Sequence, residues 1–186
     1  MKKTVLTFGL ISGAILAVMM LATVPFMDRI GFDRGEIIGY TSMVVAFLLI
    51  FFGIRSYRDN VAGGTVRFIR AFTVGALIAG VASICYVATW QLVYYKLAPD
   101  FSEKYQAYTL EKARANGATE QELVRKKADM DRFTALYRNP LVNVAITFIE
   151  PLPVGLVIAL LSAAALSRRS KGEQGTDAVQ MAGVRV

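Results

Sequence analysis

The sequence predicts an all-α membrane protein: a bundle of four transmembrane helices, with a helical hairpin in the long loop between the third and fourth spans. Hydrophobic residues make up 55% of the 186-residue chain, more than a soluble domain of this length usually contains. They gather in four runs, each long enough to cross a bilayer core, which takes about 20 helical residues. We expect one membrane domain at 1–169 and a polar, disordered tail at 170–186. The spans are expected at about 4–26, 37–54, 69–95 and 141–167.

The first run follows Met1-Lys-Lys, a start that also resembles a secretory signal peptide. Its apolar length from Val5 to Val24 exceeds the about 7–15 residues of a signal-peptide core, and no clean A-x-A cleavage site precedes Pro25. We therefore expect a retained helix, with a cleaved signal peptide as the alternative. The leading lysines and the basic second loop predict that both termini lie in the cytoplasm.

The connections around the second run differ in charge. The segment from Asp28 to Glu36 carries both signs and is expected to form a short outer turn. The loop after the second run is dense in arginine and nearly free of acidic residues, which is typical of a cytoplasmic connection. Its basic residues are Arg55, Arg58, Arg67 and Arg70.

Small residues recur at every fourth position in three of the runs. The pairs are Gly9 and Gly13, Gly75 and Ala79, and Gly155 and Ala159. A spacing of four puts each pair on one helix face, where small side chains let two backbones approach closely. These faces predict either packing within the bundle or a homo-oligomer held through one of them.

The loop at 96–140 is expected to form the helical hairpin. Asp100-Phe-Ser-Glu103 can cap a helix that runs to about Ala115. Asn116-Gly117 then signals a turn, and Thr119-Glu-Gln-Glu122 is a capping box that opens a second helix. Apolar and aromatic residues share one face of each helix, so we expect the hairpin to lie on the outer membrane surface or on the bundle. A solvated helical connector is the alternative.

The last run contains a carboxylate and two prolines, at Glu150, Pro151 and Pro153. Counting back about 20 residues from Ser167, one bilayer core, puts Glu150 just inside the outer boundary. Prolines cost little in the first turn of a helix, because the N–H groups there lack intrahelical partners anyway. We therefore expect a break in this span, with Glu150 near the cap and Pro151 starting the half-helix that crosses the membrane.

Glu150 has two interpretations. It either caps a kinked helix and pairs with a nearby polar side chain, or it lines an outward-facing pocket for a cation, a proton or an amine. The second interpretation follows because carboxylates inside membranes are functional candidates. The candidate polar site consists of Glu150, Gln91, Tyr94 and Arg138.

Composition excludes several kinds of site. Histidine is absent and cysteine occurs once, at Cys85, which removes histidine acid–base catalysis, the usual zinc sites and an intrachain disulfide. We therefore predict no enzyme activity, cofactor or metal. The net charge of +7 comes from basic residues beside apolar runs, which indicates anionic lipid rather than nucleic acid. The expected partners are membrane lipids, together with a second copy or a partner membrane protein.

Three features of the sequence resemble the bacterial domain-of-unknown-function 4199 family. They are Gly-Ala-Thr-Glu-Gln-Glu-Leu at 117–123, which opens a charged helix, then Asn139-Pro140, and a final span with Pro and Gly. The resemblance covers about residues 2–168 and implies a small protein of the bacterial inner membrane, without an established activity. We expect a non-enzymatic accessory or envelope component that acts through helix packing and its outer loop. The alternative is a small oligomeric transporter or channel that uses the site around Glu150.

Overall fold

The computed structural model describes residues 1–167, and the regular structure within them is helical throughout. The N-terminal part consists of α1 (Lys2–Thr23), the 3₁₀ turn η1 (Val24–Phe26), α2 (Met27–Ile30), α3 (Phe32–Phe47) and α4 (Leu49–Asn60). The C-terminal part consists of α5 (Phe68–Leu92), the π-helical turn η2 (Val93–Leu97), α6 (Phe101–Ala115), α7 (Glu120–Tyr137), α8 (Pro140–Ile149) and α9 (Leu152–Leu166). The tail predicted at 170–186 lies outside the described residues.

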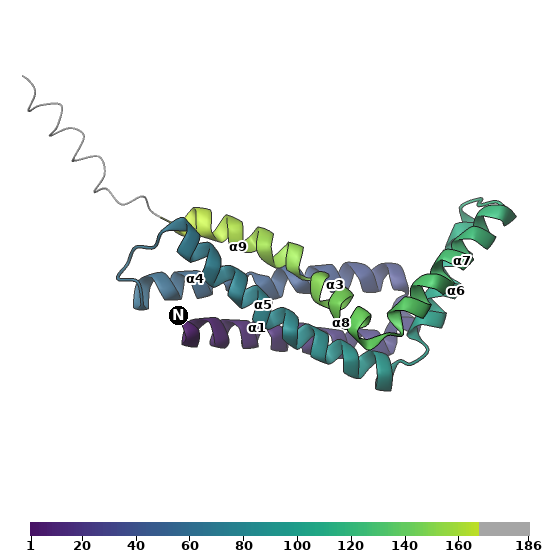
Figure 1. The fold of residues 1–186 in the computed structure, drawn as a ribbon, viewed down its shortest axis with the longest axis horizontal. Coiled ribbons are helices and arrows are strands. Elements are labelled where there is room, and N and C mark those ends of the chain that lie inside the picture. The colour runs from purple at the N-terminus through teal and green to yellow at the C-terminus, as the bar shows by residue number, and fades with distance from the viewer. Residues whose placement is uncertain (168–186) are drawn as a thin grey trace, which may run out of the picture.

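Four helical segments of the described chain are long and apolar enough to cross a membrane. We call them the four spans: Lys2–Ile30, Phe32–Asn60, Phe68–Leu97 and Pro140–Leu166. Each exposes large hydrophobic side chains, as at Leu10, Val45, Ile84 and Leu161, a surface that suits contact with lipid better than contact with water. The N-terminus, the α4–α5 connection and the end of α9 lie at one end of the bundle, and α6 and α7 lie at the other (Figure 1). The predicted fold class is confirmed.

The connection between the first two spans is shorter than the sequence indicates. The charged segment expected as a turn is helical on both sides of Gly31, and the second span begins at Phe32 rather than near 37. Gly31 has φ +82°, a conformation that glycine adopts without the steric penalty of a Cβ atom. One residue therefore reverses the chain, and Glu36 becomes part of α3 instead of a connecting turn.

The first small-residue face packs α1 on α5. A Cβ atom added at Gly9 would lie 2.7 Å from Cβ of Val81, and one added at Gly13 would lie 2.5 Å from Cβ of Cys85. Neither distance is possible for real side chains, so the two backbones approach as closely as glycine allows.

The other two small-residue faces pack α5 on α9. A Cβ atom added at Gly75 would lie 2.8 Å from Cβ of Ala159, and one added at Gly155 would lie 2.8 Å from Cβ of Ala79. The two glycine–alanine pairs are reciprocal, since each helix supplies one glycine and one alanine. The small residues therefore serve contacts within the chain, and α5 lies at the centre of the bundle.

The half of the bundle nearer the termini is closed by a packed core. Phe47, Ile50, Ile54 and Ile78 are fully buried there. Such residues fill the space between helices at the density of a protein interior. The space at the opposite end is not filled in this way, and the candidate site lies there.

The hairpin is docked on the bundle through an aromatic cluster. The ring of Phe32, at the start of α3, lies 5.8 Å from Phe101, 5.5 Å from Tyr105 and 5.0 Å from Tyr108, measured between centroids. These three α6 residues share one helix face, and their rings contact Phe32 from the side of the hairpin. Phe32 of the second span therefore contacts most of the aromatic side chains in the first half of α6.

Two ion pairs add to this docking. Nζ of Lys104 lies 2.7 Å from Asp28, and Lys112 pairs with Asp33. The hydrogen bond that Lys104 donates to Asp28, followed by the one it donates to Asp100, raises the pKa of Lys104 above its ordinary value. Because all these side chains are largely exposed, the pairs position the hairpin more than they stabilise it.

Candidate functional site

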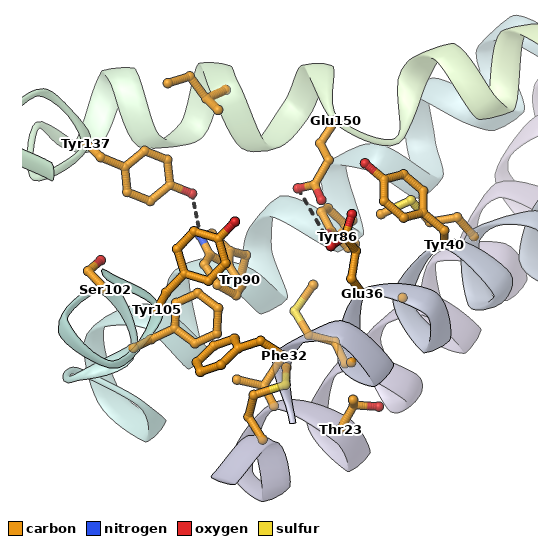
Figure 2. A pocket seen from close by; sticks show the side chains of 18 of the residues that line it. Thr23, Phe32, Glu36, Tyr40, Tyr86, Trp90, Ser102, Tyr105, Tyr137 and Glu150 are labelled. Carbon is orange, nitrogen blue, oxygen red and sulfur yellow. Dashed lines mark hydrogen bonds between the residues drawn. The ribbon is translucent and has the colours of Figure 1, made fainter. Parts of the chain in front are cut away.

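A cavity of about 640 Å³ lies where the hairpin meets the bundle. Side chains from α1, α2, α3, α5, α6, α7 and α8 line it, and Figure 2 shows them converging from several helices. The volume falls within the roughly 300–1,000 Å³ of typical small-molecule sites. The hairpin forms one wall, so the cavity exists only because α6 and α7 are docked on the spans.

Most of the cavity wall is apolar or aromatic. Its methionines are Met19, Met20, Met27, Met43 and Met130, and its aromatic residues include Phe32, Trp90, Phe101 and Phe133. Methionine side chains are flexible and polarisable, so they adapt to apolar ligands of different shapes. This part of the wall suits a large apolar group.

The charged part of the wall is mainly acidic. Glu36 of α3, Asp129 of α7 and Glu150 line the cavity together with one ammonium group, that of Lys126. Figure 2 shows the side chains of Glu36, on α3, and Glu150, between α8 and α9, pointing into the same space, with the hydroxyl group of Tyr40 nearby. The sequence indicated Glu150 as a candidate, whereas Glu36 was expected in a connecting turn.

The interruption of the fourth span positions Glu150. Helix α8 ends at Ile149 and α9 begins at Leu152, so Glu150 and Pro151 form the connection. Pro153 lies in the first turn of α9, where its missing N–H group breaks no helical hydrogen bond. The hydroxyl group of Tyr86 donates to Oε2 of Glu150 at 3.2 Å. The carboxylate is thus held at a backbone break by a residue of α5.

The other three residues of the predicted site lie apart from Glu150. Nε2 of Gln91 donates to Oδ1 of Asn143 at 2.7 Å, and the hydroxyl group of Tyr94 lies 3.2 Å from that of Ser102. Arg138 is exposed. Within residues 1–167, no hydrogen bond or ion pair joins any of the three to Glu150. Tyr86 is the partner that the structure provides instead.

A chain of hydrogen bonds fixes the wall beside the cavity. Nε1 of Trp90 donates to the hydroxyl group of Tyr137 at 2.8 Å, and this hydroxyl lies 3.0 Å from that of Thr147. Thr147 donates in turn to Oδ1 of Asn143 at 3.5 Å. Burial raises the pKa of Tyr137 above its ordinary value, so the phenol stays neutral and both accepts and donates. The chain ties α7 to α5 and α8.

Sequence reasoning missed Glu36, Tyr86, Asn143 and Thr147. A usable signal was present, because Asn143, Thr147 and Glu150 follow one another at intervals of four and three. This spacing puts all three on one face of an otherwise apolar helix. A polar face inside a membrane-length run indicates contacts with other helices or with a ligand.

A family model supports the resemblance noted from the sequence. The model described as "Protein of unknown function (DUF4199)" matches residues 7–168, which include all the elements that line the cavity. No curated protein and no solved structure matches the chain. Because the match covers most of the sequence, the chain belongs to the DUF4199 family.

Proposed function

We propose that this protein is a non-enzymatic, multi-pass component of the bacterial inner membrane that binds an amphiphilic small molecule beneath its outer helical hairpin. It would act as an accessory or envelope component, alone or with a partner membrane protein. The observation that carries the proposal is the cavity of about 640 Å³ between the hairpin and the spans. Its mixed wall, methionine and aromatic on one part and acidic on another, matches a molecule with an apolar body and a polar end.

The contents of the cavity wall favour binding over catalysis. Its titratable groups are carboxylates, phenols and one ammonium, and the chain has no histidine. Tyr86 donates a hydrogen bond to Glu150. We interpret this contact as a positioning hydrogen bond and not as a nucleophile paired with its base. Carboxylates and aromatic rings are the groups that a binding site for a cationic or apolar ligand uses, which supports the proposal of binding.

The orientation is also a proposal. The charge pattern favours cytoplasmic termini, which would place α6 and α7 outside the cytoplasm. A reporter enzyme inserted at Gly117, in the exposed turn of the hairpin, is expected to be active only in the extracytoplasmic space. Activity in the cytoplasm would reverse the orientation.

Binding can be tested with N-phenyl-1-naphthylamine, a neutral amphiphilic fluorophore. The chain contains one tryptophan, Trp90, and it lines the cavity, so energy transfer from Trp90 reports a probe bound there. The purified protein in a mild detergent is expected to show saturable transfer. Absence of saturable transfer would overturn the proposed function.

A matched pair of variants separates cavity binding from probe dissolved in the detergent. Gly39 lines the cavity, and a Cβ atom added there or at Gly80 meets nothing within 4 Å. Gly39→Phe is therefore expected to fill the cavity and abolish transfer, while Gly80→Phe, on α5 away from the cavity, is expected to leave it unchanged. Equal transfer in both variants would show that the probe binds elsewhere.

A small oligomeric transporter or channel is the second candidate. It is favoured by the interrupted fourth span with Glu150 at the break, a geometry also found at transporter sites. The packed core around Phe47 and Ile78 closes the path to the other end of the bundle in this conformation. Flux of an organic cation into proteoliposomes that is abolished by Glu150→Gln would favour transport over binding.

A further inference from the structure

The acidic residues of the cavity wall outnumber its one ammonium group and form no ion pair within the described chain. Glu36, Asp129 and Glu150 share the wall with only Lys126, and none of these four takes part in an ion pair within residues 1–167. Three carboxylates beside a single ammonium group leave an excess of negative charge in this wall, which attracts cations and repels anions. The wall therefore favours a cationic ligand and disfavours an anionic one.

Aromatic rings line the same cavity as these carboxylates. Trp90 and Phe101 meet edge to face with centroids 5.2 Å apart, and Phe32 and Tyr105 meet similarly at 5.5 Å. The faces of such rings attract organic cations, and tryptophan does so most strongly. An organic cation would thus meet both carboxylates and ring faces in this cavity.

Exposed lining residues on α3 and at the α8–α9 connection indicate that the cavity opens at the side of the bundle. Helix α3 packs on α1 and α9, whereas α8 packs on α5 and α7, and both α3 and α8 supply lining residues. Among these residues, Glu36, Tyr40 and Glu150 are exposed. A ligand can therefore enter sideways, keeping its apolar part against membrane-facing surface while its charge reaches the carboxylates.

We propose that the ligand is an amphiphilic organic cation, a positively charged nitrogen or similar centre on an apolar body, bound with its charge between Glu36 and Glu150. This proposal rests on the proposed function and names the ligand class of the same cavity. Two sources supply this chemistry: the ammonium headgroup of a membrane lipid and a free hydrophobic amine. The arrangement of carboxylates, rings and side opening fits both.

The test compares two ions of the same shape and opposite charge, tetraphenylphosphonium and tetraphenylborate, by the emission of Trp90. Tetraphenylphosphonium is expected to bind saturably, and tetraphenylborate is expected not to bind. Glu150→Gln and Glu36→Gln are each expected to weaken tetraphenylphosphonium binding about tenfold, the order expected when one charged contact is lost. Glu103→Gln, which removes an exposed α6 carboxylate outside the cavity, is expected to leave binding unchanged.

The outcomes separate the ligand class from the function. Equal binding of the two ions, or tetraphenylphosphonium binding unaffected by either glutamine variant, would overturn the cation assignment. Binding of N-phenyl-1-naphthylamine that Gly39→Phe blocks, without tetraphenylphosphonium binding, would overturn this assignment alone. If N-phenyl-1-naphthylamine itself does not bind, the proposed function falls as well.

Lipid nanodiscs distinguish the two sources. If bilayers of phosphatidylethanolamine, compared with phosphatidylglycerol, weaken tetraphenylphosphonium binding to the unaltered protein more than to Glu150→Gln, the headgroup of the aminolipid competes for the site; the variant corrects for attraction of the cation to the anionic bilayer. If the two bilayers give equal affinity, a free amine is the source. Either result is consistent with a cation site, because the comparison of bilayers is made only after tetraphenylphosphonium binding has been shown to depend on Glu150.

Discussion

The hydroxyl group of Tyr86 donates a hydrogen bond to Oε2 of Glu150 at 3.2 Å, across 64 positions of the chain. The contact joins the central helix α5 to the break between α8 and α9. It meets the fourth span at the point where the backbone itself is interrupted. The direction of the Glu150 carboxylate therefore depends on one phenol, which adds to the other contacts between the two spans.

Tyr86→Phe removes only this hydroxyl group. Hydrogen bonds between membrane helices stabilise by about 0.6 kcal/mol on average, so we expect a loss of unfolding free energy of about that size, measured by thermal unfolding in detergent. Tyr40→Phe is the control, because Tyr40 also lines the cavity but has no hydrogen bond to another side chain within residues 1–167. Equal losses in the two variants would show that the contact with Glu150 contributes nothing.

Gly75→Ala tests the close approach of α5 and α9. The added Cβ atom would lie 2.8 Å from Cβ of Ala159, and such overpacking typically costs about 1–3 kcal/mol. Gly80→Ala on the same helix meets nothing within 4 Å and is expected to be neutral or slightly stabilising, because alanine has the higher helix propensity. Thermal unfolding of both variants in the same detergent measures the difference. A stable Gly75→Ala protein would contradict the packing described for this pair.

Phe32→Ala tests the docking of the hairpin. Loss of the ring that contacts Phe101, Tyr105 and Tyr108 is expected to free the base of α6 and to speed hydrogen exchange there, while α9 keeps its protection. Phe26→Ala is the control, because its ring lies at the same end of the bundle but is 51% exposed. Unchanged exchange in α6 after Phe32→Ala would mean that the other contacts hold the hairpin, namely the ion pairs and the contacts of Trp90 and Tyr94.

The pH dependence of the hairpin is expected to involve Asp131. The hydrogen bond from Lys127, and then that from Gln106 of α6, lowers the pKa of Asp131 below its ordinary value of 3.8. A carboxyl group with a lowered pKa adds stability above its unfolded pKa and loses it as the pH falls through the folded one. Contact between α6 and α7 should therefore weaken only in acid below 3.8.

Side-chain carboxyl NMR of the protein in detergent measures this titration. The midpoint for Asp131 is expected below 3.8, and it should move up towards that value in Lys127→Met. Lys126→Met is the matched control, because the neighbouring Lys126 forms no ion pair within residues 1–167. A midpoint at or above 3.8 in the unaltered protein would remove the basis of this prediction.

The elements of the fold were predictable because each depends on residues close together in the chain. The capping box at Thr119 and Glu122 forms as its sequence indicates, with hydrogen bonds of 2.8 and 3.3 Å between the two residues. The turn after α6 uses Gly117 at φ +84°, as expected of Asn-Gly. The sequence placed the start of the second span at 37, whereas α3 begins at Phe32. The charged residues at 33–36 suggested a turn, but tertiary contacts stabilise a helix there.

The candidate site was predictable only in part. Glu150 was recognisable because a carboxylate in a membrane-length apolar run is a candidate for a functional role. Its proposed neighbours were predicted from depth alone, since they lie near the same end of their helices: Gln91, Tyr94 and Arg138. Equal depth does not establish contact, because a helix presents its side chains in all directions around its axis. Tyr86, one turn before Trp90, has the rotation that reaches Glu150.

The sequence by itself determined the four membrane-length helices, the hairpin and the interruption at Pro151. The length of an apolar run, the capping residues and the geometry of proline depend on residues close together in the chain. They can therefore be recognised without knowing which other helices pack nearby. Only the tertiary structure decided that Glu36, Tyr86 and Glu150 surround one cavity, and that the small residues serve contacts of α5 with α1 and α9. Those outcomes depend on the rotation and spacing of helices distant in sequence, which close packing of the whole bundle sets.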